Sequence, residues 1–146
     1  MVNLKDFNAD IGLLAEGGMI AIKQGDEESA KKLFNAVGIL DPKSTTKKMG
    51  YGLIAVHKMD VPQSISIFKE LYESDPNNRR AQAFLAFSYM LSLLEKKGSE
   101  EEKMLNLKEG IRHAQESHDN ATDESTLQLS QSILDWQKEL NEVNQG

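Results

Sequence analysis

Apolar residues along the chain recur three and four positions apart, the spacing that places side chains on one face of an α-helix. In the stretch from residue 27 to residue 40, this face carries Ala30, Leu33, Phe34 and Val37. Near the carboxyl end, a second clear stripe carries Leu129, Ile133, Trp136, Leu140 and Val143. The pattern therefore predicts an all-α protein built from amphipathic helices.

Polar residues indicate where some of these helices begin. Asp26 stands directly before the stripe at residues 27–40, where its carboxylate can accept hydrogen bonds from the first helical amides. Ser99 followed by Glu102 forms a capping box, which predicts another helix start. Two Glu–Lys pairs four residues apart support the helix that follows Asp26: Glu27–Lys31 and Glu28–Lys32.

A set of residues recurs with a period of 34. Pro42 and Pro76 each follow an aspartate, and an Asp-Pro step ends a helix because the residue before proline is pushed out of the α region. Measured back from each proline, the matching pairs are Phe34 and Phe68, Ala30 and Ser64, Ala21 and Ala55, and Gly18 and Gly52. The glycines fit positions where two helices of a hairpin approach closely. Each unit is therefore expected to be a pair of helices closed by an Asp-Pro step.

A 34-residue period with a small residue, a turn, a small-x-x-x-Phe step and a closing proline is the pattern of the tetratricopeptide repeat. The chain resembles that family over at least its first two thirds. The resemblance implies a single domain, residues 1–146, folded as a right-handed superhelix of about three helical hairpins. The expected boundaries are about 11–44 for repeat 1, about 45–78 for repeat 2, about 79–120 for a degenerate repeat 3 with an extended hairpin, and about 123–144 for a carboxyl-terminal capping helix.

The third repeat departs from the pattern. Ala86 and Tyr89 match the first helix of a repeat, and we expect this helix to run on through MLSLLEKKG at residues 90–98. The partner helix then begins late, with Gly110 and Ala114 as displaced small residues, and no proline closes the unit. The result would be a long hairpin with a charged tip.

Composition narrows the class of partner. The chain has 17 Lys and Arg against 23 Asp and Glu, a net charge of −6, whereas nucleic acids and anionic membranes are bound by clustered cations. We therefore expect neither partner. The absence of cysteine excludes disulfides, zinc–thiolate sites and thiol nucleophiles. The start, MVNLKDFNADIGLL, has acidic residues where a signal peptide needs basic ones, and no apolar run approaches the roughly 20 residues that span a bilayer. We expect a cytoplasmic protein.

No catalytic constellation stands out in the sequence. The three histidines are His57, His113 and His118, and the last two are five residues apart, which places them on different faces of a helix. Nucleophile elbows, phosphate loops and glycine-rich dinucleotide motifs are missing. The chain is therefore expected to be no enzyme and to carry neither a cofactor nor a metal.

The tetratricopeptide resemblance implies a concave groove lined by the first helix of each hairpin. In the expected register the groove is apolar and rich in methionine, a side chain that repacks around varied partners. The carboxylate clamp of Lys, Asn and Arg found in some tetratricopeptide domains is absent. The candidate binding residues are Ala15, Met19, Ile22, Met49, Leu53, Val56, Phe87, Met90 and Leu91. The same residues would be apolar if the amino-terminal segment, the long third hairpin or a second copy of the chain filled the groove.

Size, acidity, repeat number and an apolar groove together resemble the small tetratricopeptide chaperones of bacterial type III secretion. That resemblance implies a non-enzymatic protein that holds an amphipathic segment of a client in its groove until export. The alternatives are a homodimeric scaffold or adaptor and a regulatory interaction protein.

Overall fold

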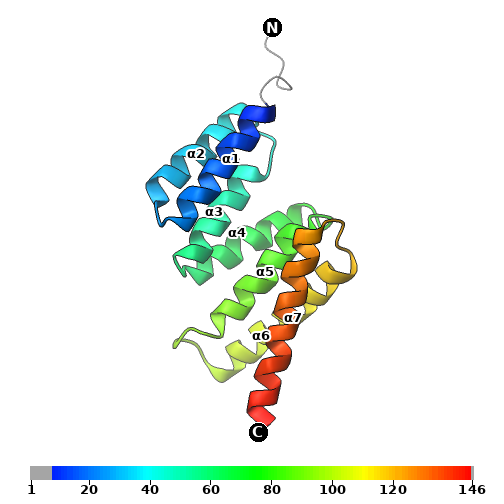
Figure 1. The fold of residues 1–146 in the computed structure, drawn as a ribbon. Helices are drawn as coiled ribbons and strands as arrows, with labels where there is room; N and C mark the ends of the chain where they lie inside the picture. Colours follow the sequence, from blue (N-terminus) through cyan, green and yellow to red (C-terminus); the bar gives the residue numbers. More distant parts are fainter. Residues whose placement is uncertain (1–7, 146) are drawn as a thin grey trace. The chain divides into compact units, whose positions relative to one another are not determined.

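A computed structural model describes residues 8–145 of the chain, and the described part is entirely helical apart from its turns (Figure 1). The all-α prediction is confirmed. Its helices are α1 (Asn8–Lys23), α2 (Glu27–Leu40), α3 (Thr46–His57), α4 (Val61–Ser74), α5 (Arg79–Ser92), α6 (Glu100–Asp119) and α7 (Glu124–Gln145). Within residues 8–145, no helix combines the length and the apolar character needed to cross a membrane.

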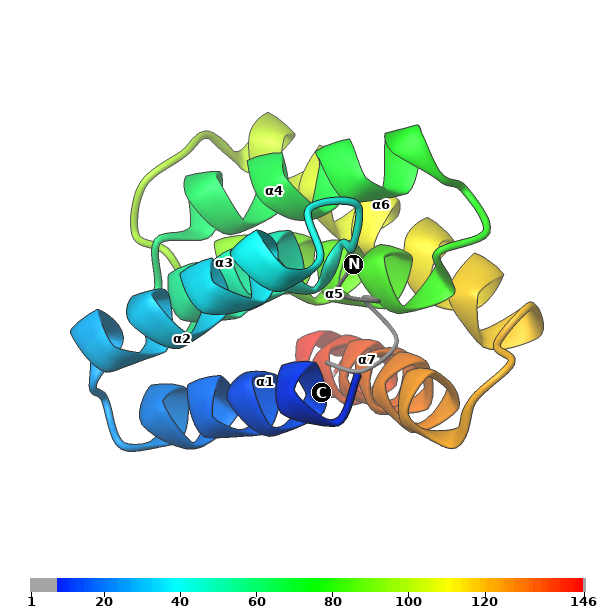
Figure 2. The same cartoon turned by 90° about the horizontal axis from the view of Figure 1, so that it is seen from above.

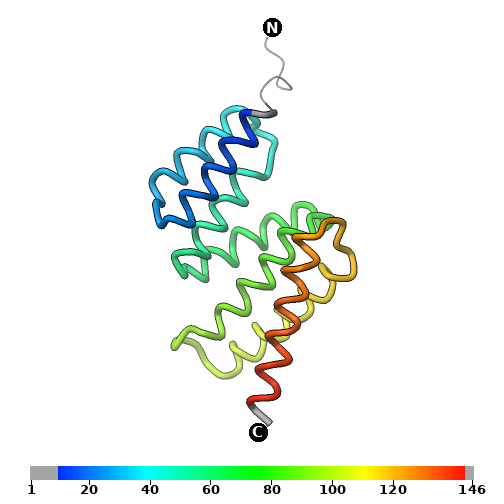
Figure 3. The backbone as a smooth tube through the Cα atoms, viewed as in Figure 1, coloured from blue at the N-terminus to red at the C-terminus, as the bar shows by residue number. Residues whose placement is uncertain are grey.

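The chain divides into two compact units, residues 1–63 and residues 64–146. In the first unit α1, α2 and α3 pack against one another, and in the second unit α5, α6 and α7 do the same (Figures 2 and 3). Helix α4 contributes its first turn to the first unit and the remainder to the second. The first unit is thus a helical hairpin covered by α3, whereas the second unit combines α5, α6 and α7 with most of α4.

The core of the first unit is built around Phe34 of α2. Its ring is almost fully buried and packs with Ala21, Ile22, Ala30 and Ile54. Glycines on the two neighbouring helices make room for the ring. A Cβ atom built on Gly18 of α1 would lie 2.6 Å from Phe34 Cε2, and one built on Gly50 of α3 would lie 2.4 Å from Phe34 Cδ1.

These distances confirm that Gly18 stands where two helices approach closely. Its repeat partner Gly52 is buried in α3, but the residue that faces Phe34 from this helix is Gly50. The 34-residue period alone did not single out Gly50.

The turn between α1 and α2 has the same backbone conformation as the turn between α3 and α4. Gly25 adopts φ 75° and Met59, 34 residues later, adopts φ 57°. In both turns the next amide closes the same hydrogen bond at 2.9 Å, from Asp26 N to the Ala21 carbonyl and from Asp60 N to the Ala55 carbonyl. Methionine rarely adopts positive φ, so the fold rather than the local sequence imposes this conformation on Met59.

The bounds of α2 and α4 follow the same period. Both α2 and α4 contain 14 residues, and their bounds differ by 34 positions. Asp26 accepts a hydrogen bond from Ser29 N at 3.1 Å, as predicted, and Asp60 accepts one from Gln63 N at 3.4 Å. The predicted Glu–Lys pairs of α2 also form, at 2.8 Å and 3.4 Å.

The core of the second unit joins α5, α6 and α7. Ala86 and Met90 of α5 pack with Ala114 of α6 and Ile133 of α7. Gly110 permits this approach, since a Cβ on it would lie 3.1 Å from Met90 Sδ. The predicted stripe of α7 packs on this cluster through Leu129, Ile133, Trp136 and Leu140, whereas Val143 is 78% exposed.

The expected extension of α5 through residue 98 is wrong, because the helix ends at Ser92. The amides of Leu93 and Leu94 turn back to the carbonyls of Met90 and Leu91, which closes the last turn with tight hydrogen bonds. A loop of residues 93–99 follows. Ser99 then caps α6 by accepting a hydrogen bond from Glu102 N at 3.1 Å, as predicted. The hairpin of α5 and α6 is therefore extended by α6, which has 20 residues, and not by α5.

Candidate functional site

The nine candidate groove residues divide between the two units. Six belong to the first unit: Ala15, Met19, Ile22, Met49, Leu53 and Val56. Three belong to the second unit: Phe87, Met90 and Leu91. Each set has to be assessed within its own unit.

Most of the candidate groove residues of the first unit remain partly exposed at its surface. Ala15, Met19 and Leu53 are partly buried and pack against the same core cluster. Met49 and Val56 on α3 are also partly buried. Ile22 is 7% exposed and belongs to the core itself. The first unit therefore presents an apolar face on α1 and α3, called here the α1–α3 face, that consists of Ala15, Met19, Met49, Leu53 and Val56.

Most of the candidate groove residues of the second unit are buried. Met90 has no exposed surface and Leu91 is 7% exposed, so both are core residues in this structure. Phe87 is partly buried and packs against the cluster to which α7 contributes. The apolar spacing of α5 did not reveal that α7 would cover this side of the helix.

Other large apolar residues are exposed at positions that the repeat pattern did not single out. Leu13 and Ile20 of α1 are 66% and 49% exposed. At the α5–α6 end of the second unit, three further side chains are more than half exposed: Leu94, Met104 and Leu105. The seven-residue spacing of Leu13 and Ile20 is a helical-face signal that could have drawn attention to them.

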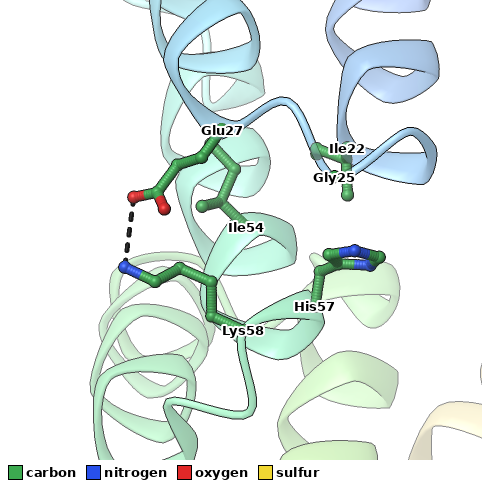
Figure 4. A pocket seen from close by; sticks show the side chains of 6 residues that line it. All are labelled: Ile22, Gly25, Glu27, Ile54, His57 and Lys58. Carbon is green, nitrogen blue, oxygen red and sulfur yellow. Dashed lines mark hydrogen bonds and ion pairs between the residues drawn. The ribbon is translucent and has the colours of Figure 1, made fainter.

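A small pocket lies in the first unit, where Ile22 and Ile54 meet the turn at Gly25 (Figure 4). On one side the Lys58 ammonium bonds Glu27 Oε1 at 3.1 Å. Hydrogen bonds from Lys31 and Lys58 lower the pKa of the Glu27 carboxyl. The volume of about 60 Å³ is well below the ~300 Å³ at which ligand clefts begin. This pocket has room for water but not for a substrate.

A larger pocket of about 280 Å³ lies in the second unit between α4, α5 and α6. It is called here the tyrosine pocket. Two of its residues, Leu85 and His113, are buried, and Tyr72 and Tyr89 are partly buried beside them. Four charged residues complete the lining: Lys69, Glu73, Glu109 and Arg112.

A polar network centred on buried Gln82 reaches the tyrosine pocket through His113. Gln82, which has no exposed surface, donates from Nε2 to Glu116 Oε2 at 2.8 Å and lies 3.2 Å from His113 Nδ1. The Gln82 carbonyl oxygen accepts from Arg79 at 2.9 Å. His113 Nε2 lies between two charged groups, with Arg112 Nη2 at 3.1 Å and Glu109 Oε2 at 3.5 Å.

The environment shifts the protonation of several groups in this region. Burial, followed by the nearby Arg112 guanidinium, lowers the pKa of His113, so the ring favours its neutral form. A hydrogen bond from Arg112 lowers the pKa of Glu109. Burial raises the pKa of Tyr89. Nothing in the sequence indicated the network of Gln82, His113 and Glu116. Gln82 lies 31 residues from His113 and 34 residues from Glu116, on a different helix.

Within residues 8–145, no three His, Asp or Glu side chains gather in a way that could hold a metal ion. In comparisons with known proteins, no family model, no curated protein and no solved structure matches the chain. Any assignment therefore rests on the chain's own repeats and surfaces.

Proposed function

We propose that the chain is a tetratricopeptide-like protein, a right-handed superhelix of about three helical hairpins with a capping helix, and that it binds an amphipathic segment of another protein. The observation that carries this proposal is the repetition of backbone detail at 34 residues. Two successive hairpin turns share a left-handed residue, Gly25 and Met59, and the same closing hydrogen bonds. A period of 34 with two helices per unit is typical of the tetratricopeptide repeat.

The proposed binding surface is the α1–α3 face. Ala15, Met19 and Leu53 pack against the core with one side and remain partly exposed on the other. A segment that buries several hundred Å² here would gain several kcal/mol at ~25 cal/mol per Å², before the cost of ordering it. Methionines at positions 19 and 49 allow the face to repack around different apolar side chains. Phe87, Met90 and Leu91 are left out of this surface because they serve the core of the second unit.

A finer proposal concerns the kind of partner. Size, acidity and repeat number resemble the small chaperones of type III secretion, whose clients expose amphipathic segments before assembly. A client helix on the α1–α3 face would be kept from premature polymerisation, and the net charge of −6 would keep the complex soluble.

The test is capture of the client from the protein's own cells with tagged wild type and two variants. Met49→Glu places a charge on the α1–α3 face, whereas Met104→Glu places one at a residue that is 67% exposed in the second unit. We expect one small self-assembling protein to be retained by wild type and Met104→Glu and lost with Met49→Glu. Circular dichroism would verify that both variants remain helical. Equal retention by all three proteins would contradict the proposed surface.

A homodimeric scaffold is the second candidate, and the exposed apolar side chains of α1 favour it. Leu13 and Ile20 stand seven residues apart on one side of this helix, where a second copy could cover them. Sedimentation over a range of concentrations distinguishes the two functions. A stable dimer that Leu13→Glu converts to monomer would support the scaffold, and a monomer at all concentrations would exclude it.

A further inference from the structure

The tyrosine pocket has a size and lining that the α1–α3 face does not share. Its volume of about 280 Å³ is at the lower end of the ~300–1,000 Å³ range of ligand sites. A pocket of this size accepts one long side chain or a small molecule rather than a helix. All of its residues belong to the second unit, so what it binds does not depend on the surface proposed above.

Aromatic rings from three helices meet in this pocket. The ring of Tyr72 lies edge-on to His113 with centroids 5.2 Å apart, and the ring of Tyr89 stacks on His113 with centroids 6.1 Å apart. Buried Leu85 adds an apolar contact. Aromatic faces attract cations and pack well against the methylene stems of Lys and Arg.

The charged residues that line the pocket are two cations and two carboxylates, and they differ in how they are paired. Arg112 is already paired twice, with Glu109 at 2.7 Å and with Glu116 at 3.3 Å. Glu73 and Lys69 line the pocket. The His113 ring favours its neutral form because it is buried, so it adds no positive charge to the pocket.

The charge of the whole chain is concentrated in the unit that holds the pocket. Residues 64–146 contain nine Lys and Arg against fifteen Asp and Glu, a net charge of −6, whereas residues 1–63 contain eight of each and are neutral. The negative electrostatic potential of the second unit raises the local concentration of cationic ligands and disfavours anionic ones.

We propose that the tyrosine pocket binds the Lys or Arg side chain of a basic protein segment. The methylene stem would lie against Tyr72 and Tyr89, with the cationic group beside Glu73. An anion held by Lys69 is the competing occupant. The second unit would then bind a basic segment through one side chain, independently of what the first unit binds.

The experiment titrates isotope-labelled full-length protein with four capped amino acids and follows the ring signals of Tyr72, Tyr89 and His113 by NMR. The cationic probes are N-acetyl-lysine methylamide and N-acetyl-arginine methylamide. Their controls are the neutral norleucine derivative and the anionic glutamate derivative. We expect saturable chemical-shift changes with the cationic probes. The norleucine derivative should bind about 2- to 5-fold more weakly, because a cation on an aromatic face gains about 0.5–1 kcal/mol.

Two matched variants on α4 decide the sign of the charge. Glu73→Gln should weaken the cationic probes about 2- to 5-fold, and Lys69→Gln should leave their binding equal or tighter. Both residues are exposed, so neither change threatens the fold. Tightest binding of the glutamate probe, with loss in Lys69→Gln, would overturn the proposal in favour of an anion site. Equal binding of norleucine, or no ring shift with any probe, would also overturn it.

Discussion

The burial of Phe34 between two glycines leads to a sharp prediction for Gly50→Ala. In most helices this change is favourable, because alanine has a helix propensity about 1 kcal/mol better than glycine. Here the new Cβ would lie 2.4 Å from two atoms of the Phe34 ring, far inside the ~3.5 Å of a normal carbon contact. The ring cannot retreat freely, because it also packs closely against Gly18, where an added Cβ would lie only 2.6 Å from Phe34 Cε2.

The two effects oppose each other, and overpacking should dominate. Forcing an extra carbon into a tight core costs about 1–3 kcal/mol. After the helix-propensity gain of about 1 kcal/mol, the net loss of stability in the first unit should reach up to about 2 kcal/mol. Gly12→Ala is the matched control, because it lies in the same unit and its Cβ would meet no atom within 4 Å. It should stabilise the protein by about 0.5–1 kcal/mol.

The assay is urea denaturation followed by circular dichroism, with fluorescence of Trp136, the single tryptophan, as a separate report on the second unit. Phe34→Leu should cost less in the Gly50→Ala background than in wild type, since the smaller side chain relieves the clash. If Gly50→Ala stabilises the protein as much as Gly12→Ala does, the ring does not occupy this space and the reasoning is wrong.

Three further predictions follow from the turns, the buried network and the helix start. Met59→Gly should raise stability in urea by up to about 1 kcal/mol, because a left-handed backbone costs a side-chain-bearing residue about 1–2 kcal/mol and glycine regains most of it; a loss of stability would contradict this. The pKa of His113 is lowered in the folded protein, so the unfolded chain binds more protons at mildly acidic pH. The free energy of unfolding should therefore be highest above pH ~6.5 and should fall as the pH drops toward the folded pKa of His113. His113→Gln should flatten that part of the profile, and an unchanged slope would refute the assignment. Ser99→Ala should cost about 1 kcal/mol in urea denaturation and Ser99→Asp should retain the cap; equal stability of the two would count against it.

Local signals in the sequence predicted helix boundaries well. Asp26 and Ser99 act as caps at the expected positions, because a capping side chain bonds amides only a few residues away. The period of 34 was also visible, since the equivalent turns make the same local hydrogen bonds. The end of α5 at Ser92 was missed, because neither glycine nor proline follows that helix directly.

The arrangement of surfaces was harder to predict because it depends on which helix covers which face. Met90 has the apolar character of a groove residue, yet it is buried against Gly110 and Ile133 on two other helices. The network of Gln82 and His113 joins residues 31 positions apart, and its members look like ordinary polar residues along the chain. Such sites become visible only once the packing of α4, α5 and α6 is known.

The most direct test of the account is hydrogen–deuterium exchange of the protein with and without the client recovered from its own cells. The account predicts slower exchange on binding in α1 and α3 of the first unit, and no such change in the Met49→Glu variant. Slowing confined to the second unit, or no slowing at all in α1 and α3, would contradict the claim that the α1–α3 face binds the client.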